Sequence, residues 1–92
     1  MTNNIIKRLE ELLEYYESRV DGFNARHDGI CIQLYYYVKF DKLTEKESNI
    51  IHDYLWDNIS TKSVVYYFKD NLERVEVIKR MIKEFKEKIS CC

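Results

Sequence analysis

Two small groups of residues have the types that catalysis or metal binding would need. His52-Asp53 has the adjacent pairing seen in some metal sites, and Cys31 could act as a nucleophile beside a histidine. A metal site needs further His and Asp ligands, and the only other histidine is His27. Cys91-Cys92 are adjacent rather than spaced for tetrahedral zinc, and no third orienting residue accompanies Cys31. We therefore predict no catalytic residue, no metal ligand and no cofactor, and interpret Cys31 as a small buried side chain.

The chain is rich in aromatic residues, with eight tyrosines, four phenylalanines and one tryptophan among 92 residues. They cluster at 15–16, 35–37, 54–56 and 66–68. Neighbouring residues on a helix point about 100° apart, so a small core cannot take every member of these clusters. Tyrosine and tryptophan combine a large contact area with a polar tip, which favours interfaces and base stacking. Two interpretations stay open: most rings fill the core, or some form a recognition surface.

The aromatic residues that precede the last predicted helix are the strongest binding candidates. Tyr66 and Tyr67 lead into that helix and Arg74 lies in its first turns. Free backbone N–H groups and the helix dipole there favour an anionic ligand or a carboxylate. The competing interpretation is that Asp70 and Glu73, on the same turn, already pair with Arg74. With two loop residues added as anion contacts, the predicted binding residues are Tyr66, Tyr67, Arg74, Arg26 and His27.

Three segments have the apolar spacing of amphipathic helices. The first covers residues 3–19, where apolar residues recur in steps of three and four. Thr44 with Glu47 begins the second, and Asp70 with Glu73 begins the third, because each pair has the spacing of a capping box. The third helix carries a nearly heptad-spaced apolar seam, formed by Leu72, Val75, Ile78, Ile82, Phe85 and Ile89.

Residues 29–40 fit two kinds of secondary structure. Apolar residues alternate strictly from Ile30 to Phe40, which is typical of a strand, yet Cys31, Leu34 and Val38 also share one helical face. Tyr35 falls on that helical face as well. Two strands alone make a weak sheet, and three helices surround this segment. We therefore favour a helix for 29–40 over a strand, and expect a short extended segment at 64–68. The predicted fold class is all-α or nearly so, a compact four-helix domain.

Length and charge restrict the number of domains and the kinds of partner that we expect. Ninety-two residues make a single domain, 1–92, and the net charge of −1 gives no basic face for non-specific nucleic-acid binding. No apolar run approaches the ~20 residues that span a bilayer, and charges at the start argue against a signal peptide. Three cysteines do not form a disulfide framework, so we expect a cytoplasmic protein without membrane contact.

Several of these residues occur in an order with a known parallel. They are Gly29-Ile30-Cys31, then Leu43-Thr44 with Glu47, then Ile51, Leu55 and Asn58, then Tyr66-Tyr67-Phe68, and finally Arg74 with Ile78 and Ile82. Over residues 29–85 this order resembles a family of small uncharacterised bacteriophage proteins. The chain departs from them by lacking a proline between Asn58 and Phe68. The resemblance implies a helical fold and a phage origin, with the host cytoplasm as location, and implies no activity.

We therefore expect a non-catalytic binding protein that forms a homo-oligomer, most simply a two-fold dimer. The motivation is the seam at 72–89 together with the surplus aromatic residues. The phage resemblance favours a bacterial host or defence protein as the partner. One alternative is an oligomer that sequesters a small cyclic nucleotide, with tyrosines stacking on bases and arginines holding phosphates. Another is a structural subunit without a ligand.

Overall fold

The computed structural model describes residues 2–20, 29–58 and 71–90, and four helices account for most of them. They are α1 (Thr2–Glu17), α2 (Ile30–Lys39), α3 (Glu45–Asn58) and α4 (Asn71–Ser90). The described residues contain no strand, so the all-α four-helix prediction is confirmed. The preference for a helix at 29–40 is confirmed as well, and the strand alternative is wrong. The extended segment expected at 64–68 lies outside the described residues.

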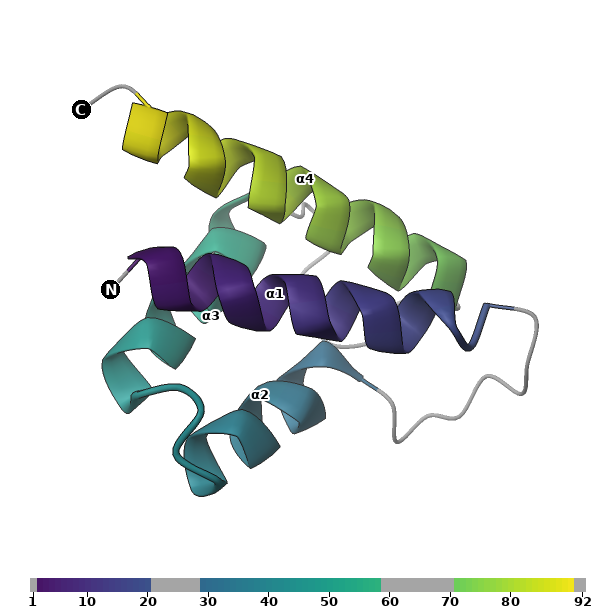
Figure 1. The fold of residues 1–92 in the computed structure, drawn as a ribbon, viewed down its shortest axis with the longest axis horizontal. Helices are drawn as coiled ribbons and strands as arrows, with labels where there is room; N and C mark the ends of the chain where they lie inside the picture. The colour runs from purple at the N-terminus through teal and green to yellow at the C-terminus, as the bar shows by residue number, and fades with distance from the viewer. Residues whose placement is uncertain (1, 21–28, 59–70, 91–92) are drawn as a thin grey trace.

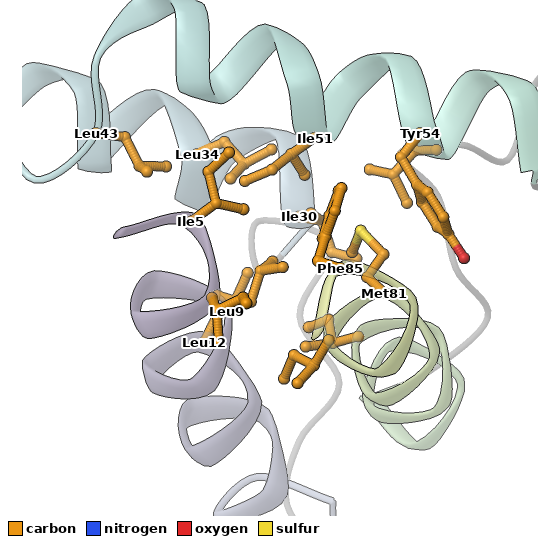
Figure 2. Packing of buried hydrophobic residues seen from close by; sticks show 14 of the residues in the cluster. Ile5, Leu9, Leu12, Ile30, Leu34, Leu43, Ile51, Tyr54, Met81 and Phe85 are labelled. Atoms are coloured by element: carbon orange, nitrogen blue, oxygen red, sulfur yellow. The ribbon is translucent and has the colours of Figure 1, made fainter. Parts of the chain in front are cut away.

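The two longest helices pack side by side. In Figure 1, α1 and α4 run antiparallel along the length of the molecule, and α2 and α3 lie together against α1. The predicted stripes meet here, because Leu9 and Leu12 of α1 are buried, as are Val75 and Ile78 of α4. Burying each such side chain contributes about 1.5–3 kcal/mol. Figure 2 shows side chains from all four helices converging on this core.

Among the predicted α4 seam residues whose side chains the structure describes, which leaves out Ile89, one is not in the core. Leu72 is 54% exposed, and Met81, which was not assigned to the seam, is fully buried. Val75, Ile78, Ile82 and Phe85 follow the prediction and are buried. The contact between α1 and α4 therefore uses most of the apolar seam within one chain.

The capping box predicted at the start of α3 is present. The Thr44 backbone N–H donates to Glu47 Oε1 at 2.9 Å, and the Glu47 N–H donates to Thr44 Oγ1 at 3.1 Å. These two bonds satisfy N–H groups that a helix start leaves without an intrahelical partner. The start of α3 is therefore fixed by its own sequence. The second predicted cap, Asp70, lies outside the described residues.

The end of α2 is closed by a Schellman turn with an unusual residue in its left-handed position. Asp41 has φ 61°, the backbone region that glycine normally occupies. The Asp41 N–H donates to Val38 O at 3.1 Å and the Lys42 N–H donates to Tyr37 O at 2.8 Å, which are the two bonds of the motif. The Lys42 ammonium also lies 5.6 Å from the centre of the Tyr37 ring.

The first turns of α1 hold this connection between α2 and α3 in place. Asn4 Nδ2 donates to Lys42 O at 3.0 Å and to both Glu47 carboxylate oxygens at 3.1 and 3.2 Å. Arg8 Nε donates to the same Lys42 carbonyl at 3.0 Å, while its Nη1 pairs with Glu11 at 2.5 Å. Polar contacts as well as packing therefore fix the orientation of α2 relative to α1.

Candidate protein-binding surface

Helix α2 is apolar on two opposite faces. Ile30 and Leu34 are fully buried on the inner side, and Val38 is partly buried against the same core. Four further apolar residues point outward and form what we call the α2 outer face, namely Ile32, Tyr35, Tyr36 and Phe40. A helix that is apolar on all sides is normally buried on all sides, so the exposed face of α2 calls for an explanation.

The rings of the α2 outer face contact one another. Tyr36 and Phe40, one turn apart, have ring centroids 6.3 Å apart and planes 18° apart, a stacked arrangement. Tyr35 meets Tyr36 edge to face at 5.7 Å. The exposed fractions are 61% for Tyr35, 44% for Tyr36 and 65% for Phe40. Because the rings already pack on one another, a partner would find them largely pre-positioned.

Charge is nearly absent from this helix. Lys39 is the single charged residue among the ten of α2, in a chain where charged residues make up 34%. Interface centres are typically depleted in charge and enriched in aromatic residues. The composition and the exposure of the α2 outer face therefore both match a protein-contact surface.

The inner side of α2 packs against the rest of the chain. Tyr37 is partly buried, and burial together with the nearby Glu11 carboxylate raises its pKa, against the lowering effect of Arg8. The ring thus stays a neutral phenol at physiological pH. Of the three consecutive tyrosines, Tyr37 packs toward α1 and the other two are exposed.

Arg74 is the one predicted binding residue that the structure describes. Its side chain is 2% exposed, and its Nη1 donates to Asn71 Oδ1 at 2.5 Å. The guanidinium carbon lies 5.7 Å from the centre of the Tyr16 ring, and Asn71 Nδ2 donates to Arg19 O at 3.2 Å. This group ties the start of α4 to the end of α1.

The other predicted binding residues, Tyr66, Tyr67, Arg26 and His27, lie outside the described residues. The structure therefore does not show whether they gather around Arg74, and the five-residue site stays a prediction. The α2 outer face was not singled out as a binding site from the sequence. The signal that could have found it is the apolar character of 30–40 on both helical faces.

The residues considered for chemistry are described and can be placed. Cys31 is only partly buried, not fully buried as predicted, because it lies between the inner and outer sides of α2. This partial burial raises the pKa of its thiol, which disfavours the thiolate that acts as a nucleophile. Burial lowers the pKa of His52 more than the neighbouring Asp53 raises it, so the neutral imidazole is favoured. Within residues 2–20, 29–58 and 71–90, no three His, Cys, Asp or Glu side chains gather as a metal site. The helices described there include none long and apolar enough to cross a membrane.

Among the hollows on the described surface, two are lined in part by residues of α1. One, of about 500 Å³, is an open groove between α1 and α4 with Leu13 and Ile82 among its lining residues, and Lys86 pairs with Glu10 beside it at 3.7 Å. The other, of about 530 Å³, lies next to the α2–α3 connection and includes Asn4 and Glu47. Asn4 and Glu47 hydrogen-bond to each other, so these two polar side chains of the second hollow already have a structural role.

Comparison with protein-family models, curated proteins and solved structures finds no significant match to this chain. The resemblance to bacteriophage proteins stays a prediction from the sequence.

Proposed function

We propose that this protein is a non-catalytic binding protein that contacts another protein through the α2 outer face. We further propose that the partner is a bacterial host or defence protein, whose activity is blocked or modulated by this contact. The observation that carries the proposal is the stacked, exposed and nearly uncharged group of Tyr35, Tyr36 and Phe40. The phage resemblance supports the bacterial identity of the partner.

Exposed aromatic residues are common enough singly, so the proposal rests on their grouping. Tyr35, Tyr36 and Phe40 lie within two turns of one helix and touch in pairs. Aromatic residues dominate the energetic centres of protein interfaces because they bury much area at low conformational cost. A contiguous apolar patch of this kind on a small protein typically marks an interaction site.

A nucleotide ligand has less support from the described residues. Phosphate recognition relies on arginine forks or on backbone N–H groups that face the ligand. The α2 outer face has only Lys39 beside it, and Arg74 is buried against Asn71 and Tyr16. Sequestration of a cyclic nucleotide is therefore an outcome that the test must be able to reveal.

The test compares capture from a bacterial lysate by the parent chain and by the double variant Tyr36→Ser/Phe40→Ser. Both residues are exposed, so the variant should keep the parent melting temperature. We expect one bacterial protein to be retained by the parent and to be lost by at least about tenfold with the variant, as for a central interface residue. Mass spectrometry of proteins and small molecules identifies what is bound.

The matched control is Trp56→Ser, which removes an aromatic ring that is 56% exposed on α3. It should capture the same protein as the parent. Capture that survives the double variant contradicts the proposal. A cyclic dinucleotide that raises the melting temperature by mass action, with no protein captured, supports the sequestration alternative instead.

A further inference from the structure

Lys39 lies among the rings of the α2 outer face. It follows Tyr35 by four residues and Tyr36 by three, so around the helix axis it falls between them. The Cα–Cβ bonds of a helix tilt toward its start, which directs the Lys39 stem back over the turn that holds both tyrosines. A single ammonium group is therefore carried by a surface that is otherwise aromatic and apolar.

The Lys39 ammonium has no ion-pair partner in the described part of the chain. The side chain is exposed, and it forms no hydrogen bond or ion pair within residues 2–20, 29–58 and 71–90. Helix α2 contains no acidic residue, and the nearest acid in the sequence, Asp41, lies in the turn that follows the helix. Water therefore solvates the ammonium in the free protein, and a partner that covers the α2 outer face displaces this water.

This displacement determines which partner surface complements the α2 outer face. Covering Lys39 with apolar groups alone costs free energy, because the ammonium loses its hydration and gains no counter-charge. A carboxylate opposite Lys39 forms a charge-assisted hydrogen bond that offsets the loss. The complementary surface therefore consists of apolar side chains around an Asp or Glu.

We propose that the partner segment bound by the α2 outer face is an acidic amphipathic helix. Its apolar stripe packs on the exposed rings, and one of its carboxylates pairs with Lys39. This inference rests on the proposed function, because it names the chemistry of the partner that the same face binds. The rings then supply the contact area, and Lys39 selects the partner by charge.

The shape of the α2 outer face suits a helix. Ile32, Tyr36 and Phe40 form one row at steps of four residues, and Tyr35 and Lys39 belong to the row beside it. A second helix packs by inserting a row of its own side chains between two such rows. The ten residues of α2 extend about 15 Å, which matches roughly three turns of a partner helix. The described residues contain no strand, so they offer no sheet edge to an extended peptide.

The test selects helical peptides on the purified full chain. A displayed library of peptides about four turns long, randomised along one helical face, is panned against the parent and against Lys39→Glu. The parent should enrich peptides that carry Asp or Glu within an apolar stripe. Lys39→Glu should enrich Lys or Arg there instead, because the charge requirement is reversed. In fluorescence anisotropy, Lys39→Glu should weaken the best parent peptide by about a hundredfold, and an amide in place of its acid by about tenfold.

Two further variants control the selection. Lys83→Glu makes the same charge change at an exposed residue of α4, and should enrich the same peptides as the parent. Lys39→Gln repeats the test should Lys39→Glu unfold, and should lose the preference for an acid without gaining one for a base. Circular dichroism confirms that each variant is folded.

The outcomes separate this inference from the proposed function. Enriched peptides without an acid, an acid preference that Lys39→Glu leaves unchanged, or no enrichment at all overturns the inference. Lysate capture that Tyr36→Ser/Phe40→Ser abolishes, with no acid preference among the peptides, leaves the proposed function standing. Capture that survives this double variant, while the peptides still follow the charge of Lys39, contradicts only the proposed function.

Discussion

Helices α4 and α2 differ in which of their apolar side chains the described structure buries. α4 buries Val75, Ile78 and Phe85 on one side and carries charged residues on the other, so the chain itself buries most of its described apolar side chains. α2 buries Ile30 and Leu34, yet its opposite side is aromatic and exposed. Burial on one side is enough to fold α2 into place. Its other side adds nothing to the described core, which is why we propose it as the binding surface.

The largest expected effect is on the free energy of unfolding, and it is tested with one substitution on each helix. Ile78→Ala removes a fully buried side chain of α4 and should lower the free energy of unfolding by about 3 kcal/mol, as for other core truncations. Ile32→Ala makes the same change on the α2 outer face, where the side chain is 37% exposed, and should cost less than about 1 kcal/mol. Urea denaturation at low protein concentration measures both. Equal losses would mean that the α2 outer face belongs to the core.

The second prediction concerns Arg74, which the sequence offered as a binding residue. Arg74→Ala removes the bond to Asn71 and the contact with Tyr16, and should cost about 2 kcal/mol of stability. Arg80→Ala is the control on the same helix, because its pair with Glu84 is exposed and 3.4 Å long, and should cost at most about 0.5 kcal/mol. Thermal and urea unfolding supply the values. Unchanged stability with lost partner binding would instead make Arg74 a contact residue.

The third prediction concerns the connection between α2 and α3, which helps to fix the orientation of α2. Thr44→Ala removes one half of the capping box and should cost about 1 kcal/mol. The α2 outer face should keep its binding only while this connection holds. Thr44→Ser restores a hydroxyl that can cap and serves as the control. A Thr44→Ala variant that unfolds at the parent urea concentration would show that the cap contributes nothing.

The same connection makes stability depend on pH in the acid range. The bond from the Thr44 backbone N–H, helped by Asn4 and opposed by burial, holds the pKa of Glu47 below its ordinary value of 4.5. A lowered folded-state pKa means that the ionised carboxylate favours the folded state. Its contribution is therefore complete above pH 4.5 and is lost as the pH falls through the lower folded-state value.

Glu47→Gln should lower stability at neutral pH and flatten this acid loss, because an amide does not titrate. The free energy of unfolding of parent and variant, measured from neutral pH down through the acid range, makes the comparison. Curves that stay parallel would show that another group causes the acid loss.

The smallest expected effect lies at the end of α2. Asp41 sits at φ 61°, where glycine carries no steric cost. Asp41→Gly should therefore raise stability by about 0.5 kcal/mol, and Asp41→Ala should lower it by a similar amount. Thermal unfolding distinguishes the two directions. A destabilising glycine would mean that the aspartate side chain itself holds the turn.

Sequence reasoning succeeded where one local pattern determines the structure. Thr44 and Glu47 lie three residues apart, so their capping box is readable without tertiary knowledge, and the bonds form as expected. The buried part of α4 follows from its spacing of three and four. Leu72 fits the same spacing yet is exposed, because Asn71, Arg74 and Val75 form the buried side of the first turns of α4.

The ambiguous and missed features share a different origin. Residues 30–40 alternate like a strand because both faces of the helix are apolar, so no single stripe identifies a helix. The burial of Arg74 depends on Tyr16 of α1, which is far away in sequence. Tyr35 and Tyr36 are exposed while Tyr37 is not, because Tyr37 packs toward α1. Such contacts between distant segments carry no local signature.

Hydroxyl-radical footprinting with mass spectrometry tests the central claim most directly. The claim is that the α2 outer face is covered when the protein acts. Tyr35, Tyr36 and Phe40 should be oxidised readily in dilute purified protein, and should become protected in bacterial lysate. Trp56, similarly exposed on α3, should stay reactive throughout. Contradiction would come from α2 rings that remain as reactive as Trp56 under every condition.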